Sequence, residues 1–481
     1  PLMLIDAVSA AENSQDSTIT ERATASFLAF IERRLGVRVV RDVRDFPESV
    51  ALSKPLALAK LLKEKGLLKN FHRNNQLPDE PRIHYWSAYC NDKTSHRTGG
   101  ASWSSNSDAL YAALAEVVER YIWFMKEDYF IDPTRATFSE IQKKGLALNP
   151  ADFSGYTDAQ RSGNPKRHFD INTKFTWIQG RSLVLDAPTY VPAQVVSGIR
   201  IPFSKRAKEE PLIRPIITNG LATWPSLSGA RCAGANEILE REAYMVMWLN
   251  QLTLPRYSLT SLRKLDPALA KLIDSCERYR LKMHVIKMPT DAPTHAIAVI
   301  FEDESGIVPR FTIGIRAHRS LTKCIEKAAA ETFRAFRAHR LWSREGNVWD
   351  TKTPASAVGH RERLYYWGAP ENSPRLEFLI AGPEIEAQLS LWDTDDEEQH
   401  LARIVNWCAE KKIDCVSVSL GHSPTNPTPF HIEMVVMPQL QWTHLFENDQ
   451  AFGGKRWKEL PTILGYTPRS EPFADEPHPF S

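Results

Sequence analysis

The hydrophobic positions of this chain recur at helical spacing in several long segments. Between residues 18 and 36, Ala25, Leu28, Ile31 and Leu35 fall on one face, because residues three or four apart lie on the same side of a helix. A second segment, 55–68, is rich in Leu and Lys and is also predicted to be helical. Polar residues follow up to position 81. We therefore expect residues 1–81 to form a helical N-terminal extension.

From about residue 82 onward, short apolar runs of strand length alternate with longer segments of helical periodicity. We predict strands at 175–179, 283–287, 295–301, 415–420 and 431–436, and helices at 108–125, 230–251, 323–340 and 395–411. Strands and helices mixed in this way are typical of an α/β or α+β domain. Residues 82–450 are expected to form that domain. Residues 451–481, rich in Pro and polar groups, are expected to form an extended tail.

Composition and charge exclude several classes of protein. Hydrophobic residues make up 42% of the chain and charged residues 25%, which is ordinary for a soluble globular protein. A net charge of +2 gives no global reason to bind nucleic acid or a membrane surface. No apolar run approaches the roughly 18 residues of a membrane span. The N-terminus lacks the basic region of a signal peptide, and six scattered cysteines without a C-x-x-C pair indicate reduced thiols in the cytoplasm.

Two segments share one pattern of charged residues, E-x-x-E-R. They are GGASWSSNSDALYAALAEVVERYIW, with Glu116, Glu119 and Arg120, and TNGLATWPSLSGARCAGANEILEREAYMVMW, with Glu237, Glu240 and Arg241. Each follows a turn-rich segment and precedes an apolar run. Average residue usage predicts the pattern only about 0.1 times in a chain of this length. A looser version, Asp274-x-x-Glu277-Arg278, lacks both flanking features and is interpreted as surface.

On a helix, this spacing places two carboxylates and one guanidinium on the same face. The two carboxylates repel each other, and a divalent cation would remove that penalty. Mg²⁺ prefers oxygen ligands and commonly binds a few carboxylates together with the phosphates of a nucleotide, while arginine suits phosphate oxygens. Two such helices facing each other could hold a triphosphate. The spacing alone leaves open the alternative of two solvated helix faces.

The usual nucleotide-binding sequences are absent. The segment Gly453-Gly454-Lys455 lacks the earlier glycine and the Ser or Thr of a P-loop, and there is no kinase-type H-R-D loop. If the chain uses ATP, it does so through another architecture.

Five segments together resemble the YcaO family. The two E-x-x-E-R segments resemble its nucleotide motifs, and GIRAHRSLTKCIEKAAAETF resembles its third motif, with His318 and Glu331 matching. The segment DCVSVSLGHS…HIEMVVMPQLQ resembles the family's V-P-G-L-Q strand pair, and DEPHPFS resembles the P-H-P-F-P ending of azoline-forming members. The resemblance runs in order from about residue 82 to the C-terminus. This chain departs from the family pattern at several positions: Ala112, Glu242, Arg334, Met434, Gln439 and Ser481.

The resemblance implies an ATP-dependent cyclodehydratase. A Cys, Ser or Thr side chain of a precursor peptide attacks the preceding backbone carbonyl, the resulting oxyanion takes the γ-phosphoryl group of ATP, and phosphate leaves a thiazoline or oxazoline. The implied cofactors are ATP and Mg²⁺. The implied metal ligands are Glu116, Glu119, Glu237 and Glu240. Residues implied to contact the nucleotide or to support those ligands are Asn219, Arg120, Arg241, Glu116 and Glu237.

The tail and the partners also follow from the resemblance. Pro477 and Pro479 restrict the last residues toward an extended form, so that the terminal carboxylate of Ser481 or a backbone carbonyl could help take the proton from the attacking side chain. The implied partners are the precursor peptide, a separate E1-like leader-binding protein and a flavin-dependent dehydrogenase. Two other functions stay open: a YcaO enzyme that forms a thioamide or an amidine, and a non-catalytic member that binds peptide.

Overall fold

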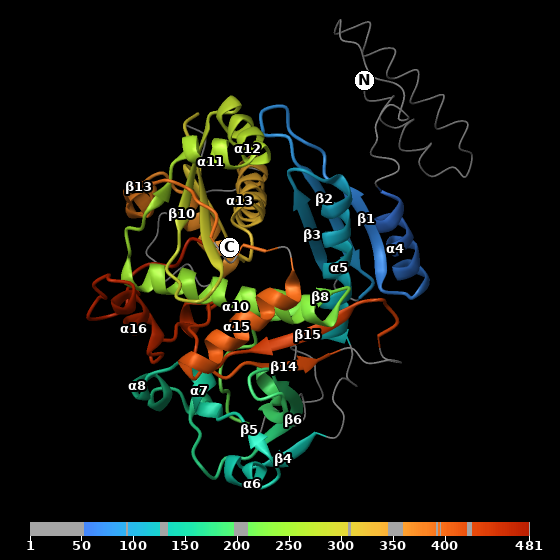
Figure 1. Cartoon of the computed structure of the whole chain (residues 1–481), viewed down its shortest axis with the longest axis vertical. Coiled ribbons are helices and arrows are strands. Elements are labelled where there is room, and N and C mark those ends of the chain that lie inside the picture. The colour runs from blue at the N-terminus through green and yellow to red at the C-terminus, as the bar shows by residue number, and fades with distance from the viewer. Residues whose placement is uncertain are drawn as a thin grey trace, which may run out of the picture. The chain divides into compact units, whose positions relative to one another are not determined.

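The computed structural model describes residues 52–92, 95–125, 133–196, 210–305, 309–344, 359–390, 393–394, 396–420 and 426–480. The helix predicted at 18–36 and the terminal Ser481 lie outside these residues. Residues from Pro55 onward form one compact unit, shown in Figure 1. The helix predicted at 55–68 is present as α4 (Ser53–Glu64).

A three-stranded antiparallel sheet begins this unit, in the order β1-β2-β3. Its strands are β1 (Leu68–Arg73), β2 (His84–Cys90) and β3 (Arg97–Ser102), and α5 (Asn106–Met125) packs on one face. Strand β1 lies inside the segment that the sequence predicted to be a helical extension, so the structure differs there. Most β1 side chains are exposed. Because this edge strand is held mainly by backbone hydrogen bonds to its neighbour, its sequence shows no alternation of apolar and polar residues.

A second sheet has five strands in the order β12-β11-β10-β9-β13. The strands are β9 (Arg256–Tyr257), β10 (Leu281–Lys287), β11 (His295–Asp303), β12 (Phe311–His318) and β13 (Glu384–Ile385). Helix α13 (Leu321–Arg344) packs along β11 and β12, and α11 (Leu259–Leu265) and α12 (Pro267–Arg278) lie beside it. Their buried side chains form one core.

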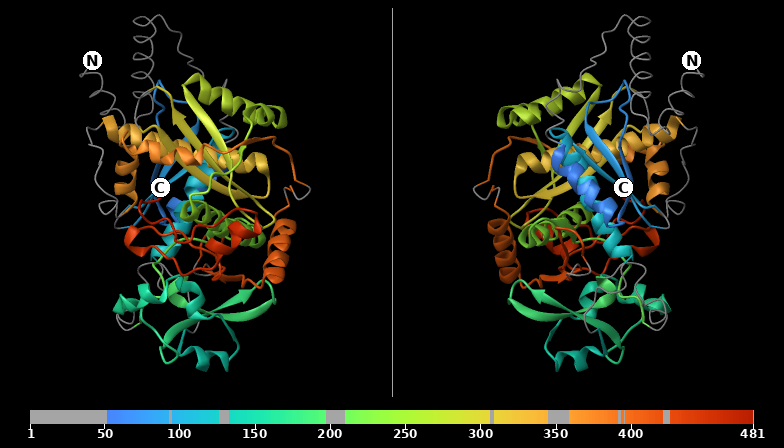
Figure 2. Two further views of the ribbon diagram at one scale, coloured as in Figure 1. Left: turned by 90° about the vertical axis from the view of Figure 1, so that its left-hand side faces the viewer. Right: turned by 90° about the vertical axis from the view of Figure 1, so that its right-hand side faces the viewer.

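A third sheet has seven strands, in the order β5-β7-β6-β14-β15-β8 with β4 added on β6. The strands are β4 (Thr134–Ala136), β5 (Leu146–Ala147), β6 (Phe175–Ser182), β7 (Ala187–Pro192), β8 (Leu221–Trp224), β14 (Val416–Ser419) and β15 (His431–Val436). Helix α10 (Leu227–Asn250) packs on β8 and β15, and α15 (Glu397–Lys411) packs on α10. In both side views, the teal and green strands β4–β7 lie at the end of the unit opposite β1–β3 (Figure 2).

Three strand–helix pairs form a closed set around the centre of the unit. They are β3–α5, β8–α10 and β12–α13. Each helix packs on its own strand and also on the strand of the next pair: α5 on β8, α10 on β12 and α13 on β3. The three long helices therefore approach one another at one place. This mixed arrangement confirms the predicted α+β fold class.

Small residues let each strand approach its helix closely. A Cβ atom on Gly100 of β3 would clash with backbone atoms of Ala109 and Ala113 in α5. A Cβ on Gly314 of β12 would likewise clash with α13, and one on Gly234 of α10 would clash with the carbonyl of Gly220. These glycines allow backbone-to-backbone contact that any side chain would prevent.

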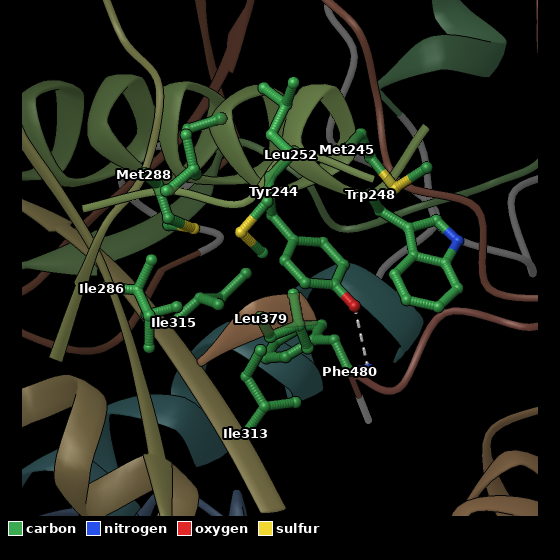
Figure 3. Packing of buried hydrophobic residues seen from close by; sticks show 14 of the residues in the cluster. Tyr244, Met245, Trp248, Leu252, Ile286, Met288, Ile313, Ile315, Leu379 and Phe480 are labelled. Carbon is green, nitrogen blue, oxygen red and sulfur yellow. Dashed lines mark hydrogen bonds between the residues drawn. The ribbon is translucent and has the colours of Figure 1, made fainter. Parts of the chain in front are cut away.

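The C-terminal segment differs from the extended tail that the sequence predicted. It contains α16 (Arg456–Ile463), whose Trp457 and Leu460 are buried against the core of α10. The last residues are extended, and Phe480 joins the same core. Figure 3 shows Phe480 below α10, with its backbone N–H directed at the Tyr244 hydroxyl. Apolar side chains of α16 that pack on α10 thus explain the helix.

The remaining helices surround these sheets. They are α6 (Phe138–Gln142), α7 (Pro150–Ser154), α8 (Asp158–Ser162) and α14 (His360–Gly368). All six cysteine thiols are free and buried. In the described part of the chain, no helix is both long enough and apolar enough to cross a membrane.

Candidate active site

The two E-x-x-E-R segments lie on α5 and α10 in matching positions. On α5, Glu116 Oε2 accepts a hydrogen bond from the backbone N–H of Gly99 at 3.1 Å. On α10, Glu237 Oε2 accepts one from the N–H of Gly220, also at 3.1 Å. Each carboxylate is thus held by the turn-rich segment that precedes its helix. Gly220 has φ +92° and a crowded Cβ position, so only glycine fits this turn well.

The arginine of each motif pairs with the carboxylates of its own helix. Arg120 Nη2 lies 3.4 Å from Glu116 Oε1. Arg241 Nη2 lies 3.5 Å from Glu237 Oε1 and 3.5 Å from Glu240 Oε1. These arginines offset part of the negative charge.

The second glutamate of each motif has a raised pKa, and on α10 it is also the more deeply buried of the two. The pKa of Glu119 is raised to about 8, mainly by burial, with the charges of Glu116 and Glu237 acting in the same direction and that of Arg120 against it. Burial also raises the pKa of Glu240, with Glu331 and Glu237 acting in the same direction. The carboxylates of α5 and α10 therefore lie close enough to repel one another across the two helices.

A third helix contributes a fifth carboxylate. Glu331 on α13 accepts a hydrogen bond from the backbone N–H of Ile315 in β12 at 3.1 Å, and its charge acts on Glu240. In the sequence, Glu331 is recognisable only as a match to the third family motif. A shared spacing could have found it: the N–H donor and the carboxylate are 17 residues apart in the first two pairs and 16 in the third.

Glu240 also joins two of the strand–helix pairs. Its Oε2 accepts a hydrogen bond from the N–H of Ala317 in β12 at 3.0 Å, and Arg316 Nη1 lies 4.0 Å away. The carboxylate of α10 is thereby fixed against the strand of the next pair.

Cationic groups gather at the edge of this carboxylate cluster. The pKa of Lys327 is lowered to about 8, mainly by burial, with the charges of Arg316 and Arg319 acting in the same direction. The Nε atoms of Arg241, Arg316 and Arg319 are buried and have no hydrogen-bond partner. Unused donors on positive groups beside clustered carboxylates fit a ligand with both a divalent cation and phosphate oxygens. The five glutamates and these donors therefore fit magnesium and a nucleotide.

Asn219 directly precedes Gly220, and none of the five carboxylates borders the cavity that its side chain lines. Its side chain is buried, its Nδ2 has no hydrogen-bond partner, and it lines a small cavity with Arg214. Its expected contact with a nucleotide stays a prediction. The Asp274–Glu277 segment is on the surface, as expected, where both carboxylates pair with Arg263.

The tail reaches the arginine of the second motif. The indole N–H of Trp367 donates to the carbonyl of Pro477 at 3.0 Å, and the N–H of Phe480 donates to the Tyr244 hydroxyl at 3.1 Å. The guanidinium carbon of Arg241 lies 4.5 Å from the centre of the Phe480 ring. Arg241 thus contacts the metal-ligand candidates on one side and the tail on the other.

Further contacts hold the tail in place. The imidazole of His478 is hydrogen-bonded to the carbonyl of His444 at 3.0 Å, and Arg363 Nη1 donates to the carbonyl of Phe480 at 3.4 Å. Pro479 lines a mainly apolar cavity beside Trp367. Of the predicted tail residues, Pro477 and Pro479 therefore belong to a packed segment near Arg241, and Ser481 lies outside the described residues.

Comparison with known proteins identifies a family and similar folds. The family model described as YcaO cyclodehydratase, ATP- and Mg²⁺-binding, matches residues 100–441. The chain is similar to a "heterocyclase in complex with substrate and cofactor", with a TM-score of 0.68 and 19% identity, over 88% of this chain and 57% of that one. No curated protein matches the chain.

Two other solved structures share the fold. The YcaO protein of Methanopyrus kandleri, bound with AMPPCP and Mg²⁺, has a TM-score of 0.57 and 17% identity, over 82% of this chain and 91% of that one. The matched chain of the E. coli microcin synthetase McbBCD complex has a TM-score of 0.55 and 16% identity, over 77% of this chain and 88% of that one. The first-mentioned heterocyclase is longer, and this chain spans less than two thirds of its length.

Proposed function

This chain belongs to the YcaO family, and from that premise we propose that it is an ATP-dependent cyclodehydratase that forms azoline rings in a precursor peptide. The observation that carries the proposal is the convergence of five carboxylates from three helices, one buried and four half-buried, with the tail packed on Arg241 beside them. Uncompensated buried charge of this kind is costly unless a cation binds. Clusters of strongly shifted carboxyl groups are typical of functional sites.

The proposed reaction makes a peptide amide oxygen into a good leaving group. A Cys thiol or a Ser or Thr hydroxyl adds to the preceding backbone carbonyl and loses its proton. The resulting oxyanion attacks the γ-phosphorus of ATP and ADP leaves. The C–O bond then breaks, phosphate departs, and the amide nitrogen loses its proton to give the C=N bond of the ring.

In this scheme, the chain's own residues mainly bind and orient the reactants. Glu116, Glu119, Glu237 and Glu240 would hold magnesium, with Glu331 as an added candidate, and the ion would neutralise charge on the phosphates. Arg241 keeps two of these carboxylates in position, while Arg316 and Lys327 offer donors to phosphate oxygens. Such positioning and charge neutralisation supply most of the rate increase in phosphoryl transfer.

The tail is proposed to lie next to the reacting amide. Its contacts with Trp367, Tyr244 and Arg363 fix it without using the carboxylate cluster. A rigid segment beside Arg241 can order the peptide and help take the proton from the attacking side chain. The proposed partners are a separate leader-binding protein and a flavin-dependent dehydrogenase, and one solved relative with this fold is described as part of a synthetase complex.

The test combines phosphate release with the mass of the peptide product. We expect phosphate release that depends on both peptide and Mg²⁺, with the peptide losing one water for each phosphate. Exchange of an oxygen for a sulfur would instead identify a thioamide-forming enzyme. Binding of peptide without any phosphate release, with the expected partner present, would contradict an enzymatic role.

A further inference from the structure

A small cavity lies beneath the turn that holds Glu237. It measures about 20 Å³, which is enough for a small particle, since roughly 10–15 Å³ suffices for a water. Its polar lining includes Arg214 and Asn219, and its apolar walls include Phe153, Ile238 and Val435. Arg214 Nε and Asn219 Nδ2 are both buried and have no hydrogen-bond partner. Trp442 Nε1 and the acceptor Gln441 Oε1, which belong to the same lining, also have no partner, so three unused donors and one unused acceptor border the cavity.

Arg214 differs from every other buried arginine in the described part of the chain. The others each pair with a carboxylate: Arg167 with Asp449, Arg337 with Glu80, Arg340 with Asp79, Arg363 with Glu447 and Arg456 with Glu242. Arg214 has no such partner among the described residues. It donates only to the carbonyl of Val195, at 3.2 Å, and lies 5.8 Å from the centre of the Phe153 ring.

This unpaired charge is costly. Burial lowers the pKa of Arg214 to about 10, and the guanidinium is still charged at neutral pH. Buried charges in folded proteins are normally paired. The other polar groups at the cavity do not supply the missing charge. The side chain of Gln441 is neutral and donates to two backbone carbonyls, and Trp442 offers only an indole N–H.

We propose that this cavity binds a small monovalent anion of halide size, such as chloride, between Arg214 and the side-chain amide of Asn219. A monatomic anion accepts hydrogen bonds from both donors, neutralises the guanidinium and fits the volume. Its apolar surroundings suit a weakly hydrated ion. A water molecule would satisfy the donors but leave the charge unpaired.

The bound anion connects to the carboxylate cluster through one residue. Asn219 is followed by Gly220, whose N–H holds Glu237, and Gly220's carbonyl accepts a hydrogen bond from Val435, another residue at the cavity. An anion that fixes Asn219 therefore also fixes the turn that orients Glu237. This connection rests on the proposed function, whereas anion binding does not.

The first experiment measures the thermal stability of the whole chain in sodium chloride, sodium bromide and sodium gluconate at constant ionic strength. A ligand that binds only the folded state raises Tm in proportion to the logarithm of its concentration. We expect Tm to rise with chloride and bromide as they replace gluconate, which is too large for the cavity. Equal Tm values in all three salts would overturn the proposal.

Variants assign the effect to this cavity. Arg214→Met removes the charge and should abolish the difference between chloride and gluconate. Arg167→Met is the matched control, because Arg167 is buried nearby but already paired with Asp449. It should keep that difference even though it lowers Tm. If Arg214→Met does not fold, Asn219→Asp replaces the anion with a fixed carboxylate and should also abolish the difference. Retention of the halide effect in the folded cavity variants would contradict the site.

Two further measurements test where the anion binds and whether it affects nucleotide binding. Crystals grown with bromide should show an anomalous peak between Arg214 and Asn219, and density that fits only water would overturn the proposal. Chloride should also tighten Mg²⁺–nucleotide binding in the wild type and have no such effect in Arg214→Met. A halide effect on Tm without one on nucleotide binding would keep the anion site and reject its link to Glu237.

Discussion

Single residues decide the chemistry of the proposed site, and Glu119 and Glu240 matter most among them. Both have a raised pKa, Glu240 is buried and Glu119 half-buried, and each belongs to a different helix. Their charges are stable only if a cation offsets them. The two motifs could be found from sequence because E-x-x-E-R is rare and occurred twice. Glu331 was not assigned a ligand role because its helix lacks that pattern. Arg214 could not be singled out from the sequence, because only the folded structure shows that it is buried without a carboxylate partner.

The first prediction concerns these carboxylates. Glu119→Gln or Glu240→Gln should leave the fold intact and reduce ATP turnover by about a hundredfold or more, since each removes a ligand and a charge that hold the phosphates. Phosphate release and circular dichroism measure the two effects. The exposed Glu277→Gln, from the similar surface sequence, is the matched control and should keep full activity. Wild-type turnover by both Glu119→Gln and Glu240→Gln would reject the ligand assignment.

The second prediction concerns His400, which is fully buried and hydrogen-bonded to Asn236. Burial lowers the pKa of this imidazole to about 4, below its value in the unfolded chain, so acid protonates the unfolded state first. The contribution of His400 to the free energy of unfolding should therefore be constant above about pH 6.5 and fall between about pH 6.5 and 4, by at most about 3 kcal/mol. Urea unfolding across this range measures it. His400→Gln should reduce the slope, and an unchanged slope would show that other groups cause the acid sensitivity.

At the level of elements, the predicted helices and the longer strands agree with the structure because their apolar periodicity reports burial directly. Helices α5, α10, α13 and α15 each lie within a few residues of the range predicted for them. Strand β1 and helix α16 were missed because tertiary contacts decide them. The pairing of β1 with β2 and the packing of Trp457 on the core of α10 leave no clear local pattern.

The third prediction tests the close approach of strand and helix. Gly314→Ala should lower the stability by about 1–3 kcal/mol or more, because its Cβ would meet backbone atoms of Ala328 and Thr332 that cannot move independently. Gly145→Ala is the control, since its Cβ would make only ordinary contacts, the nearest at 3.6 Å. Chemical denaturation should separate the two variants. Equal stability would show that α13 can shift away from β12 without cost.

The fourth prediction concerns the tail. Deletion of 477–481 should abolish ring formation and leave nucleotide binding largely intact, because the tail contacts Arg241 but supplies none of the five carboxylates. Some loss of stability is expected, since His478 and Phe480 are buried. Product mass and binding of a fluorescent nucleotide are the two readouts.

A milder variant tests the same role of the tail without removing buried residues. Trp367→Phe removes the hydrogen bond to Pro477 while keeping an aromatic ring, and should slow ring formation more than it weakens nucleotide binding. A truncated enzyme that converts peptide at the normal rate would exclude a catalytic role for the tail.

At the level of the whole molecule, the fifth prediction concerns partners. We expect the isolated chain to be slow and a separate leader-binding protein to raise its rate at low peptide concentration, because the partner would supply recognition away from the reacting amide. Steady-state rates with and without the partner provide the measurement. Full activity of the chain alone at low peptide concentration would contradict it. Neither partner nor substrate peptide could be identified from sequence, since such recognition depends on surfaces rather than on motifs.

The closed set of three strand–helix pairs also bears on the order in which the molecule folds. Each pair can form from contacts local in sequence, but the carboxylates of α5, α10 and α13 meet only when the third pair docks on the other two. Electrostatic repulsion among them is therefore absent early and appears at the final docking step. Magnesium should accordingly act late, by lowering the barrier to closure and slowing reopening, and leave the formation of the separate pairs unaffected.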